Sequence, residues 1–407
     1  MKKQRIWKNT GWLLLWMLFL AVCACQSVQA ETSDHLNMTM EQELYNSQNG
    51  LLYTATTDIA QTTDGFIWIG SYGCLMRYDG VEFIRIGEEE GISNITSLAA
   101  GKDGIIWFGM ENKGLGYYNH GVIKLYTSKN SDLFSDNIQT ICLDEEGNVY
   151  FGTEQGMGCI NLENQISRIS PENEKLCGER IRNTIMGNQN LLVCICRDGD
   201  LYFQTEDGME LAEAFTDARS VVYEEEQNRY WVGTESGTLC QCDETFQIKK
   251  EISLESLETI NDIVVLEDEK LFLCADEGTG VYDITSGQFY LQDLVMDDSV
   301  DEMMVDLQGN YWLCSSRLGV LKMSVNSFLN IGEVLTSEKS VVNTTAVFEN
   351  QLLIGCDNGL KVVDMDRWEE IEVAKLKELS GKRIRHILAD EDGTLWFCTN
   401  GYGLYCL

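Results

Sequence analysis

The stretch TDGFIWIGSYGCLMRYDG, residues 63–80, decides how this chain folds. An apolar run with one Trp leads into a Gly turn, and a second run ends in Tyr-Asp-Gly. Aligned on an anchor, the Trp or the residue that replaces it, variants return at steps of 39, 43, 42, 39, 41, 40, 41 and 43 residues. The nine anchors are Trp68, Trp107, Tyr150, Leu192, Trp231, Phe272, Trp312, Leu353 and Trp396. A period near 41 residues is typical of a four-stranded propeller blade, so we predict an all-β chain that folds as a β-propeller.

Each repeat predicts four short strands, A to D, with a turn before the anchor strand B. Three positions before the anchors stand Gly65, Gly104, Gly147, Gln189, Asn228, Glu269, Gly309, Asn350 and Gly393. So many Gly and Asn predict a backbone φ above zero at this position. Two positions after the anchors stand Gly70, Gly109, Gly152, Cys194, Gly233, Cys274, Cys314, Gly355 and Cys398, small residues that let strand B approach its neighbour. The large anchor should fill the space between blades, a burial worth roughly 1.5–3 kcal/mol.

The pattern D-x-x-G-x-[LI]-W-[IF]-G-T, followed by G-[LV]-x-x-[YF]-D and a GLxxN link, resembles the two-component regulator propeller repeat. The best copies are residues 64–80 and 390–407, and the links at 91–98 and 133–141 complete the pattern. The resemblance covers roughly residues 43–407. It implies the ligand-binding sensor region of a bacterial hybrid sensor kinase or diguanylate cyclase, followed in the intact protein by a membrane span and a cytoplasmic kinase or cyclase domain.

The resemblance also implies rings of seven blades, often in tandem. Residues 42–52 and 326–335 each look like a strand D without a blade of its own, which could close a ring against the strand C of its last blade. We therefore predict a linker at 31–42, a seven-bladed propeller at 43–325, and the first two blades of a second, incomplete propeller at 326–407. The end after a strand C indicates a truncated chain. The alternative is a single nine-bladed ring, closed by 43–47 pairing with 402–407.

The first thirty residues predict a signal peptide. Four basic residues precede the apolar run 12–24, which is short for a membrane span, and 27–30 offers small residues at the usual cleavage spacing. We predict export to the periplasm, the cell surface or the medium. A lipid anchor at Cys25 is a weaker alternative.

Charge and residue types exclude several functions. A formal net charge of −35 repels nucleic-acid phosphate, so we predict no nucleic-acid partner. Thirteen Cys remain after export, mostly at strand positions that suit a small buried hydrophobe. The pairs at 194–196 and 240–242 could begin a metal site, but no CxxC or His partner accompanies them. The acidic runs 88–90, 224–226 and 297–302 lack the ligand spacing of a calcium loop. We predict no metal and no cofactor.

Catalytic motifs are likewise missing from the sequence. The three histidines, His35, His120 and His386, belong to no recognisable constellation, so we predict no enzyme. Asp144, Asp306 and Asp390 are expected to cap their turns. A propeller lyase or hydrolase that acts on polysaccharides through carboxylates alone remains an alternative.

Arginine recurs on one face of the predicted propeller, the face built by D–A and B–C loops. These residues are Arg180, Arg182, Arg197, Arg219 and Arg317, with Arg383 and Arg385 in the last link, and Tyr53, Tyr72, Asn94 and Asn137 share the face. The planar guanidinium suits carboxylate and sulfate groups, so our hypothesis is a site for a small anionic ligand or an acidic glycan. The plainer interpretation, that these arginines only offset loop acids, ranks ahead of it.

The leading hypothesis for function is thus an extracytoplasmic sensor region that binds a ligand. A secreted propeller that binds glycan or protein without signalling is the main alternative, and a homodimer stays open.

Overall fold

The computed structural model describes residues 26–28, 40–169, 174–267, 269–325, 331–335, 340–390 and 393–406. The chain divides into two compact units, Met1–Val325 and Asn326–Leu407. The described part forms nine β-sheets and only short helices, so the predicted all-β class is confirmed. No helix within the described ranges is long and apolar enough to cross a membrane.

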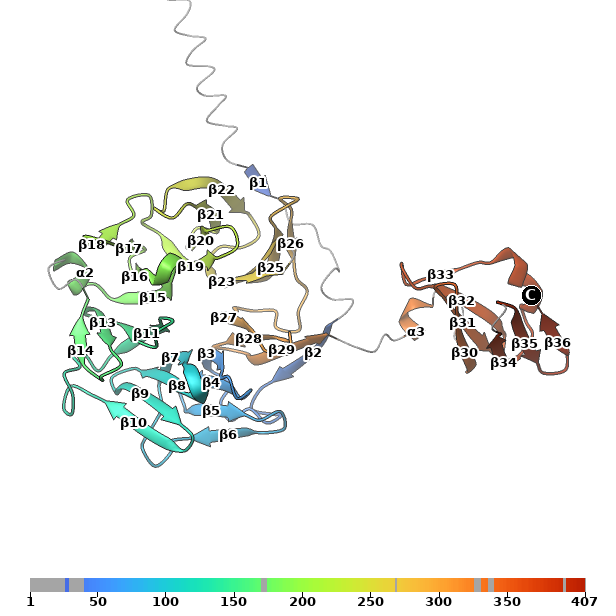
Figure 1. Cartoon of the computed structure of the whole chain (residues 1–407), viewed down its shortest axis with the longest axis horizontal. Coiled ribbons are helices and arrows are strands. Elements are labelled where there is room, and N and C mark those ends of the chain that lie inside the picture. The colour runs from blue at the N-terminus through green and yellow to red at the C-terminus, as the bar shows by residue number, and fades with distance from the viewer. Residues whose placement is uncertain are drawn as a thin grey trace, which may run out of the picture. The chain divides into compact units, whose positions relative to one another are not determined.

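Seven sheets build the first unit, each with strands A to D from the inside outward (Figure 1). Blades 1 and 2 consist of β3 (Thr56–Gln61), β4 (Ile67–Ser71), β5 (Leu75–Tyr78) and β6 (Phe83–Ile86), and of β7 (Ile95–Ala100), β8 (Ile106–Met110), β9 (Gly114–Asn119) and β10 (Val122–Tyr126). Blades 3 and 4 consist of β11 (Ile138–Leu143), β12 (Val149–Thr153), β13 (Gly156–Ile160) and β14 (Ile166–Arg168), and of β15 (Ile181–Met186), β16 (Leu192–Cys196), β17 (Leu201–Thr205) and β18 (Gly208–Leu211).

Blades 5 and 6 consist of β19 (Ala218–Glu224), β20 (Arg229–Thr234), β21 (Thr238–Cys242) and β22 (Ile248–Leu254), and of β23 (Ile260–Leu266), β24 (Lys270–Ala275), β25 (Gly278–Asp283) and β26 (Phe289–Leu291). Blade 7 consists of β27 (Glu302–Val305), β28 (Tyr311–Ser315), β29 (Gly319–Val325) and, as its outer strand, β2 (Met40–Tyr45). The 3-10 turns η1 (Lys102–Gly104) and η2 (Asn188–Asn190) and the helix α2 (Glu174–Gly178) lie in connections.

The seven blades close into a ring. Each inner strand contacts the inner strand of the next blade, from β3 through β7, β11, β15, β19 and β23 to β27, and β27 contacts β3 (Figure 1). The ring is sealed by β2, which pairs antiparallel with β29, so that Tyr45 lies opposite Val320. A single nine-bladed ring, with 43–47 against 402–407, is therefore wrong. Because β2 starts at Met40, residues 40–42 belong to the ring and not to the predicted linker.

Most of the predicted signal peptide lies outside the described residues, as does Cys25. Its described part is β1 (Gln26–Val28), which pairs in parallel with β22 at the outer edge of blade 5.

The geometry of the A–B turn explains why the repeat contains both an Asp and a Gly. All nine positions three residues before the predicted anchors have positive φ, from 48° to 102°. In blade 7, Oδ1 of Asp306 accepts the backbone N–H groups of Gln308 (2.9 Å) and Asn310 (2.8 Å), and its Oδ2 accepts the indole N–H of Trp312 (2.8 Å). Asp144 and Asp390 accept turn N–H groups in the same way, so the predicted caps are confirmed. One carboxylate thus holds the turn and satisfies a buried indole.

The anchors pack between neighbouring blades. Trp68, Trp231 and Trp312 are at most 1% exposed, and Phe272 is buried as well. Trp312 lies in the cluster between blades 7 and 1, where its ring stacks 6.2 Å from that of Tyr45 on β2. Trp107, Tyr150 and Trp396 are half-buried.

The alignment of the fourth repeat was wrong by one residue. After the irregularity in each strand A, Asn183 pairs with Ile195 just as Ser97 pairs with Gly109 in blade 2. This register makes Val193 the anchor of blade 4 in place of Leu192, and it puts Ile195, not Cys194, at the small-residue position. Because this repeat has neither a Trp nor a Gly at these positions, the sequence contains no marker of its register.

Acidic side chains of the inner strands join the blades. Oδ2 of Asp58 on β3 accepts the N–H of Leu98 on β7 at 2.6 Å, and Oδ2 of Asp262 on β23 accepts the N–H of Met303 on β27 at 3.1 Å. With Glu302, these two residues form what we call the carboxyl cluster of blades 6, 7 and 1. Burial raises the pKa of Asp58 and of Asp262 to about 6, and burial together with Asp58 raises the pKa of Glu302 well above its ordinary value.

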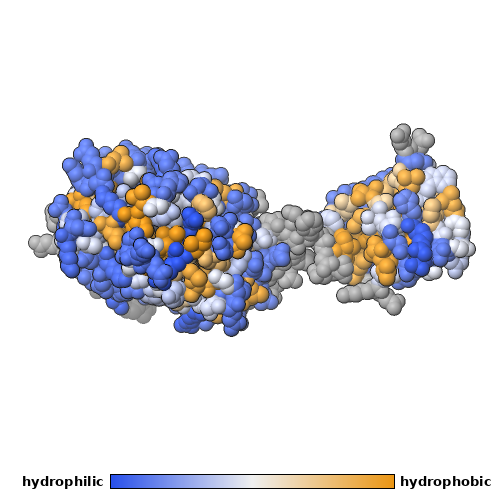
Figure 2. Space-filling view, turned by 90° about the horizontal axis from the view of Figure 1, so that it is seen from below, coloured by the Kyte–Doolittle hydropathy of each residue, from blue (hydrophilic) through white to orange (hydrophobic). Residues whose placement is uncertain are grey.

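The second unit contains two sheets. One consists of β30 (Val342–Phe348), β31 (Gln351–Cys356), β32 (Gly359–Asp364) and β33 (Glu369–Ile371), and the other of β34 (Ile384–Ala389), β35 (Leu395–Thr399) and β36 (Leu404–Cys406), with η3 (Ala374–Leu379) between them. Their inner strands β30 and β34 lie together over a core that includes Leu353 and Phe397. Figure 2 shows apolar residues on the surface of this unit, where Leu388 and Leu404 are more than half exposed.

Only residues 331–335 of the segment expected to form a strand D are described, and they are not a strand. Its described part forms the short helix α3 (Ile331–Val334). Ile331, Val334 and Leu335 pack against the apolar side chains of Ile354 and Val363, so burial on the sheet replaces strand pairing.

Candidate functional site

Antiparallel connections bring the D–A links and B–C turns of all seven blades to one end of the ring, which we call the D–A face. The five ring arginines singled out in the sequence lie here. Arg180 precedes β15, Arg182 lies within it, Arg197 follows β16, Arg219 lies in β19, and Arg317 lies between β28 and β29.

A β-bulge at the start of strand A sets which side chains reach this face. Register shifts interrupt the A–B pairing around one residue in each of the first six blades: Thr57, Thr96, Gln139, Arg182, Arg219 and Asn261. Asp301, directly before Glu302 at the start of β27, stands at the matching position of blade 7. A bulge leaves its residue outside the ladder and redirects the side chain, which is why bulges recur beside binding sites.

The bulged residues divide into a structural and a polar group. In blades 1 and 2 they are threonines, whose hydroxyls donate to the backbone of the next blade: Thr57 to Ile95 O and Thr96 to Ile138 O, both at 2.8 Å. In blade 5 Ser220 makes this contact to Ile260 O instead, which leaves the Arg219 side chain for the D–A face. The long polar side chains of blades 3 to 6 therefore form a continuous sector of this face.

Three of the predicted arginines line one cavity. Arg180, Arg182 and Arg197 together with Gln139 enclose a volume of about 260 Å³. Arg180 donates through Nε (2.9 Å) and Nη2 to Oε1 of Gln139, and Arg182 forms an ion pair of 2.6 Å with the exposed Glu235. Arg197 is exposed, and its guanidinium makes no hydrogen bond or ion pair with the described residues. Three cations thus line the cavity, and of these only Arg182 forms an ion pair with a carboxylate among the described residues.

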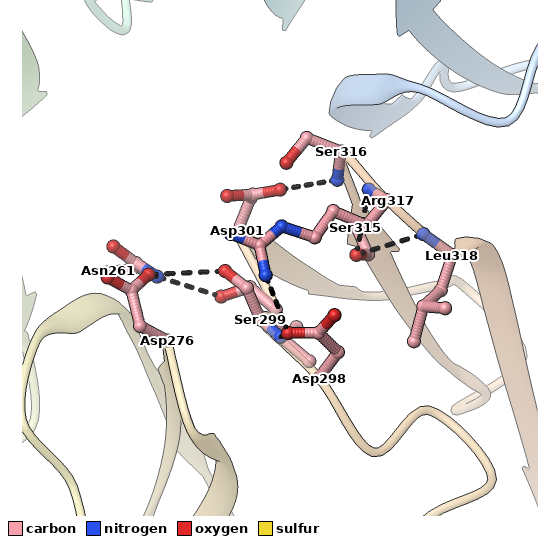
Figure 3. A network of polar contacts seen from close by, with 10 residues as sticks. Asn261, Asp276, Asp298, Ser299, Asp301, Ser315, Ser316, Arg317 and Leu318 are labelled. Atoms are coloured by element: carbon pink, nitrogen blue, oxygen red, sulfur yellow. Dashed lines mark hydrogen bonds and ion pairs between the residues drawn. The ribbon is translucent and has the colours of Figure 1, made fainter.

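Beside the cavity, Arg219 begins a hydrogen-bonded chain that leads to acidic residues. Its Nε donates to Oδ1 of Asn261 at 3.1 Å, and Nδ2 of Asn261 donates to Oδ1 of Asp276 at 2.8 Å. Burial and the nearby Arg182 lower the pKa of Arg219. Figure 3 shows that Asp276, Ser299 and Asp301 belong to the same polar network.

The other predicted residues are more scattered. Arg317 pairs with Asp298 at 3.0 Å on the acidic side, and not with the other arginines. Asn137 is buried and donates to Glu154, and the ring of Tyr53 covers Gly73. Tyr72 is exposed, and its backbone carbonyl accepts the N–H of Asn94. Asn137, Tyr53, Tyr72 and Asn94 lie in blades 1 to 3 and do not line the arginine cavity. Three contact residues were missed: Gln139 and Glu235, which contact the arginines of the cavity, and Asn261, which contacts Arg219.

A second hollow, of about 540 Å³, lies at the opposite end of the blades. It is lined by residues at the A–B ends of blades 1 to 5, including Gly101, Asp144 and Asn188, with Lys102 as the one cation among its described lining residues. Lys102 already donates to the carbonyl of Glu145. The arginine cavity is the stronger candidate because its side chains are charged, convergent and only partly paired.

Comparison with known proteins supports the family named from the repeat. Residues 132–155 and 378–401 match the family described as "Two component regulator propeller". No curated protein matches the chain.

Solved structures resemble most of the chain in fold. The extracellular domain of the hybrid two component system BT3049 from B. thetaiotaomicron is 18% identical with a TM-score of 0.60, covering 90% of this chain and 53% of that one. The corresponding domain of BT4673 from the same organism is 20% identical with a TM-score of 0.58, covering 89% and 52%. A streptogramin B lyase is 14% identical with a TM-score of 0.60, covering 71% and 99%.

The chain spans about half the length of the two-component relatives that it matches. At these identities the solved structures show the fold alone. The matched segments, the repeat period and the blade geometry agree, and the chain carries the repeats of the two-component regulator propeller family.

Proposed function

We propose that this chain is the ligand-binding sensor region of a bacterial signal-transduction protein, located outside the cytoplasm. Its site is the arginine cavity of the D–A face, and its ligand carries an anionic group, as a small acid or an acidic glycan does. The observation that carries the proposal is the convergence of Arg180, Arg182 and Arg197 in a chain of net charge −35.

The charge balance of the cavity supports an anionic ligand. Like charges held together repel, and within the described residues only Glu235 forms an ion pair with these arginines. Charge-assisted hydrogen bonds from guanidinium groups to carboxylate or sulfate are strong and directional. A bound anion would therefore relieve the repulsion and fix Arg197, the exposed member of the set.

The signalling role rests on the family of the repeats. The similar extracellular domains belong to two-component systems, and this chain spans about half of their length. In the intact protein, a membrane span and a cytoplasmic kinase or cyclase domain would pass the binding event inward.

A lyase activity is the main enzymatic alternative, because a streptogramin B lyase shares the fold, and a virginiamycin B lyase in which Ala replaces one His is described as catalytically inactive. In this chain His120 is exposed in the turn between β9 and β10, at the end of the blade away from the D–A face. His386 lies in the second unit, and His35 lies outside the described residues. His120 lies at the other end of its blade, and no histidine is among the described residues that line the arginine cavity, so we infer a binding site and not a catalytic one.

The experiment is calorimetric titration of the wild type with sulfated and carboxylated oligosaccharides and with small mono- and dicarboxylates. The Arg182→Ala, Arg197→Ala double variant should lose most of the affinity, at least tenfold, since two charge-assisted contacts are removed. Arg367→Ala, which removes one exposed arginine of the second unit, is the control for loss of a guanidinium outside the cavity and should bind normally. Equal affinity of the double variant and the wild type would overturn the proposed site.

A further inference from the structure

Two groups of like charge lie side by side on the D–A face, and Glu235 is an acid paired within the basic group. Arg180, Arg182, Arg197 and Arg219 belong to blades 4 and 5, whereas the acidic residues Asp276, Asp298 and Asp301 belong to blades 6 and 7. The two groups are neighbours, because Arg219 interacts electrostatically with Arg182 on one side and with Asp276 and Asp301 on the other.

Neutral donors hold the acidic side in place. Oδ1 of Asp276 accepts Nδ2 of Asn261 at 2.8 Å and the hydroxyl of the buried Ser299 at 3.1 Å, and Oδ2 of Asp301 accepts the N–H of Ser316 at 2.6 Å (Figure 3). Asp298 differs, since Arg317 neutralises it. Neither Asp276 nor Asp301 forms an ion pair with a described residue.

An amide separates the two halves. Arg219 and Asp276 do not contact each other directly but bind opposite ends of the Asn261 side chain. Burial and Asp276 raise the pKa of Asp301, while burial and Arg182 lower the pKa of Arg219. Each pKa shift means that the surroundings disfavour the charged form of the side chain. A ligand group of opposite charge beside Arg219 or Asp301 would therefore stabilise that charged form.

We propose that the ligand is a small zwitterion, whose anionic group binds the arginine cavity and whose ammonium group binds Asp276 and Asp301. This inference rests on the proposed function and narrows it to one ligand class. A long acidic glycan fits less well, because the part of it that extended over blades 6 and 7 would meet two carboxylates of its own sign.

The test uses ligands matched in length. Straight-chain ω-amino carboxylates of three to eight carbons are titrated by calorimetry beside the plain carboxylates of the same lengths. At least one amino carboxylate should bind about tenfold more tightly than its partner, as expected for a close charge pair. In the Asp276→Asn, Asp301→Asn variant this advantage should fall below about threefold, while the plain carboxylate binds as well or better because a repulsion has been removed.

The controls separate the inference from the proposed function. Asp207→Asn removes an exposed acid in the turn between β17 and β18, at the other end of the blade, and should change neither affinity. If the double variant has a lowered melting temperature, the test is repeated with the single variant Asp301→Asn. If the plain carboxylates bind as tightly as the amino carboxylates, the zwitterion inference is overturned while the proposed anion site stands. Failure of every carboxylate, amino carboxylate and acidic oligosaccharide to bind overturns both.

Discussion

Replacing Asp306 by Ala should destabilise the ring mainly through Trp312. Asp306 is 7% exposed and Trp312 is 1% exposed, so the indole N–H would lose its acceptor in a site that water does not reach. A buried unsatisfied donor costs about 1–3 kcal/mol, and loss of the two turn contacts to Gln308 and Asn310 costs about 1 kcal/mol more. We expect a loss of about 2–4 kcal/mol, which lowers the melting temperature by about 4–8 °C.

A double-mutant cycle isolates the bond to the indole. Trp312→Phe keeps an aromatic ring between blades 7 and 1 but removes the donor, so Asp306→Ala should cost about 1–3 kcal/mol less in that background. Urea unfolding followed by circular dichroism would give the four free energies. Asp79→Ala is the control, because this exposed Asp caps a turn through Val81 and Glu82 without an indole partner. Effects of Asp306→Ala and Trp312→Phe that add within about 0.5 kcal/mol would refute the reasoning.

Three further predictions concern packing, pH and thiols. Gly233→Ala places a Cβ 2.6 Å from a side-chain atom of the next blade, so it should lower the free energy of unfolding in urea by about 1–3 kcal/mol. In the control Gly178→Ala the new Cβ meets nothing within 4 Å, and the free energy of unfolding should hardly change. Equal effects of the two substitutions would contradict the close approach of the blades at Gly233. The carboxyl cluster holds its protons more tightly in the folded state, so its contribution to stability is complete below about pH 4 and falls as the pH rises through 6. Glu302→Gln should flatten this fall in melting temperature between pH 4 and 8, and an unchanged slope would count against the cluster. Among the thirteen described cysteines only Cys398 and Cys406 are exposed. A thiol reagent at pH 7 should therefore label these two first in the native protein, which peptide mass spectrometry can show. Early labelling of the buried thiols would contradict their burial.

Much of the fold could be predicted because its chemistry is local and repeated. The positive φ before each anchor and the Asp cap of the A–B turn need only residues within six positions of one another, and they recur from Asp144 to Asp390. The alignment of the fourth repeat was wrong because it depends on the same local signals. Leu192 and Val193 are both apolar, and no Trp or Gly distinguishes them. Burial on the sheet, a tertiary effect, made Ile331–Val334 a helix.

The site was only partly predictable. Topology placed the arginines on one face, but Gln139, Glu235 and Asn261 contact them from positions 41 to 53 residues away in the chain, which no local pattern reveals. One signal was present in the sequence. The residue that follows the first apolar position of strand A is the bulged one, and comparing this position across repeats would have found Gln139 and Asn261.

The most direct test of the central claim is an anomalous diffraction map of crystals soaked in selenate, a tetrahedral dianion that any guanidinium can bind. We expect a selenium peak within hydrogen-bonding reach of Arg180, Arg182 and Arg197. Peaks elsewhere on the protein, with none among these three arginines, would contradict this claim.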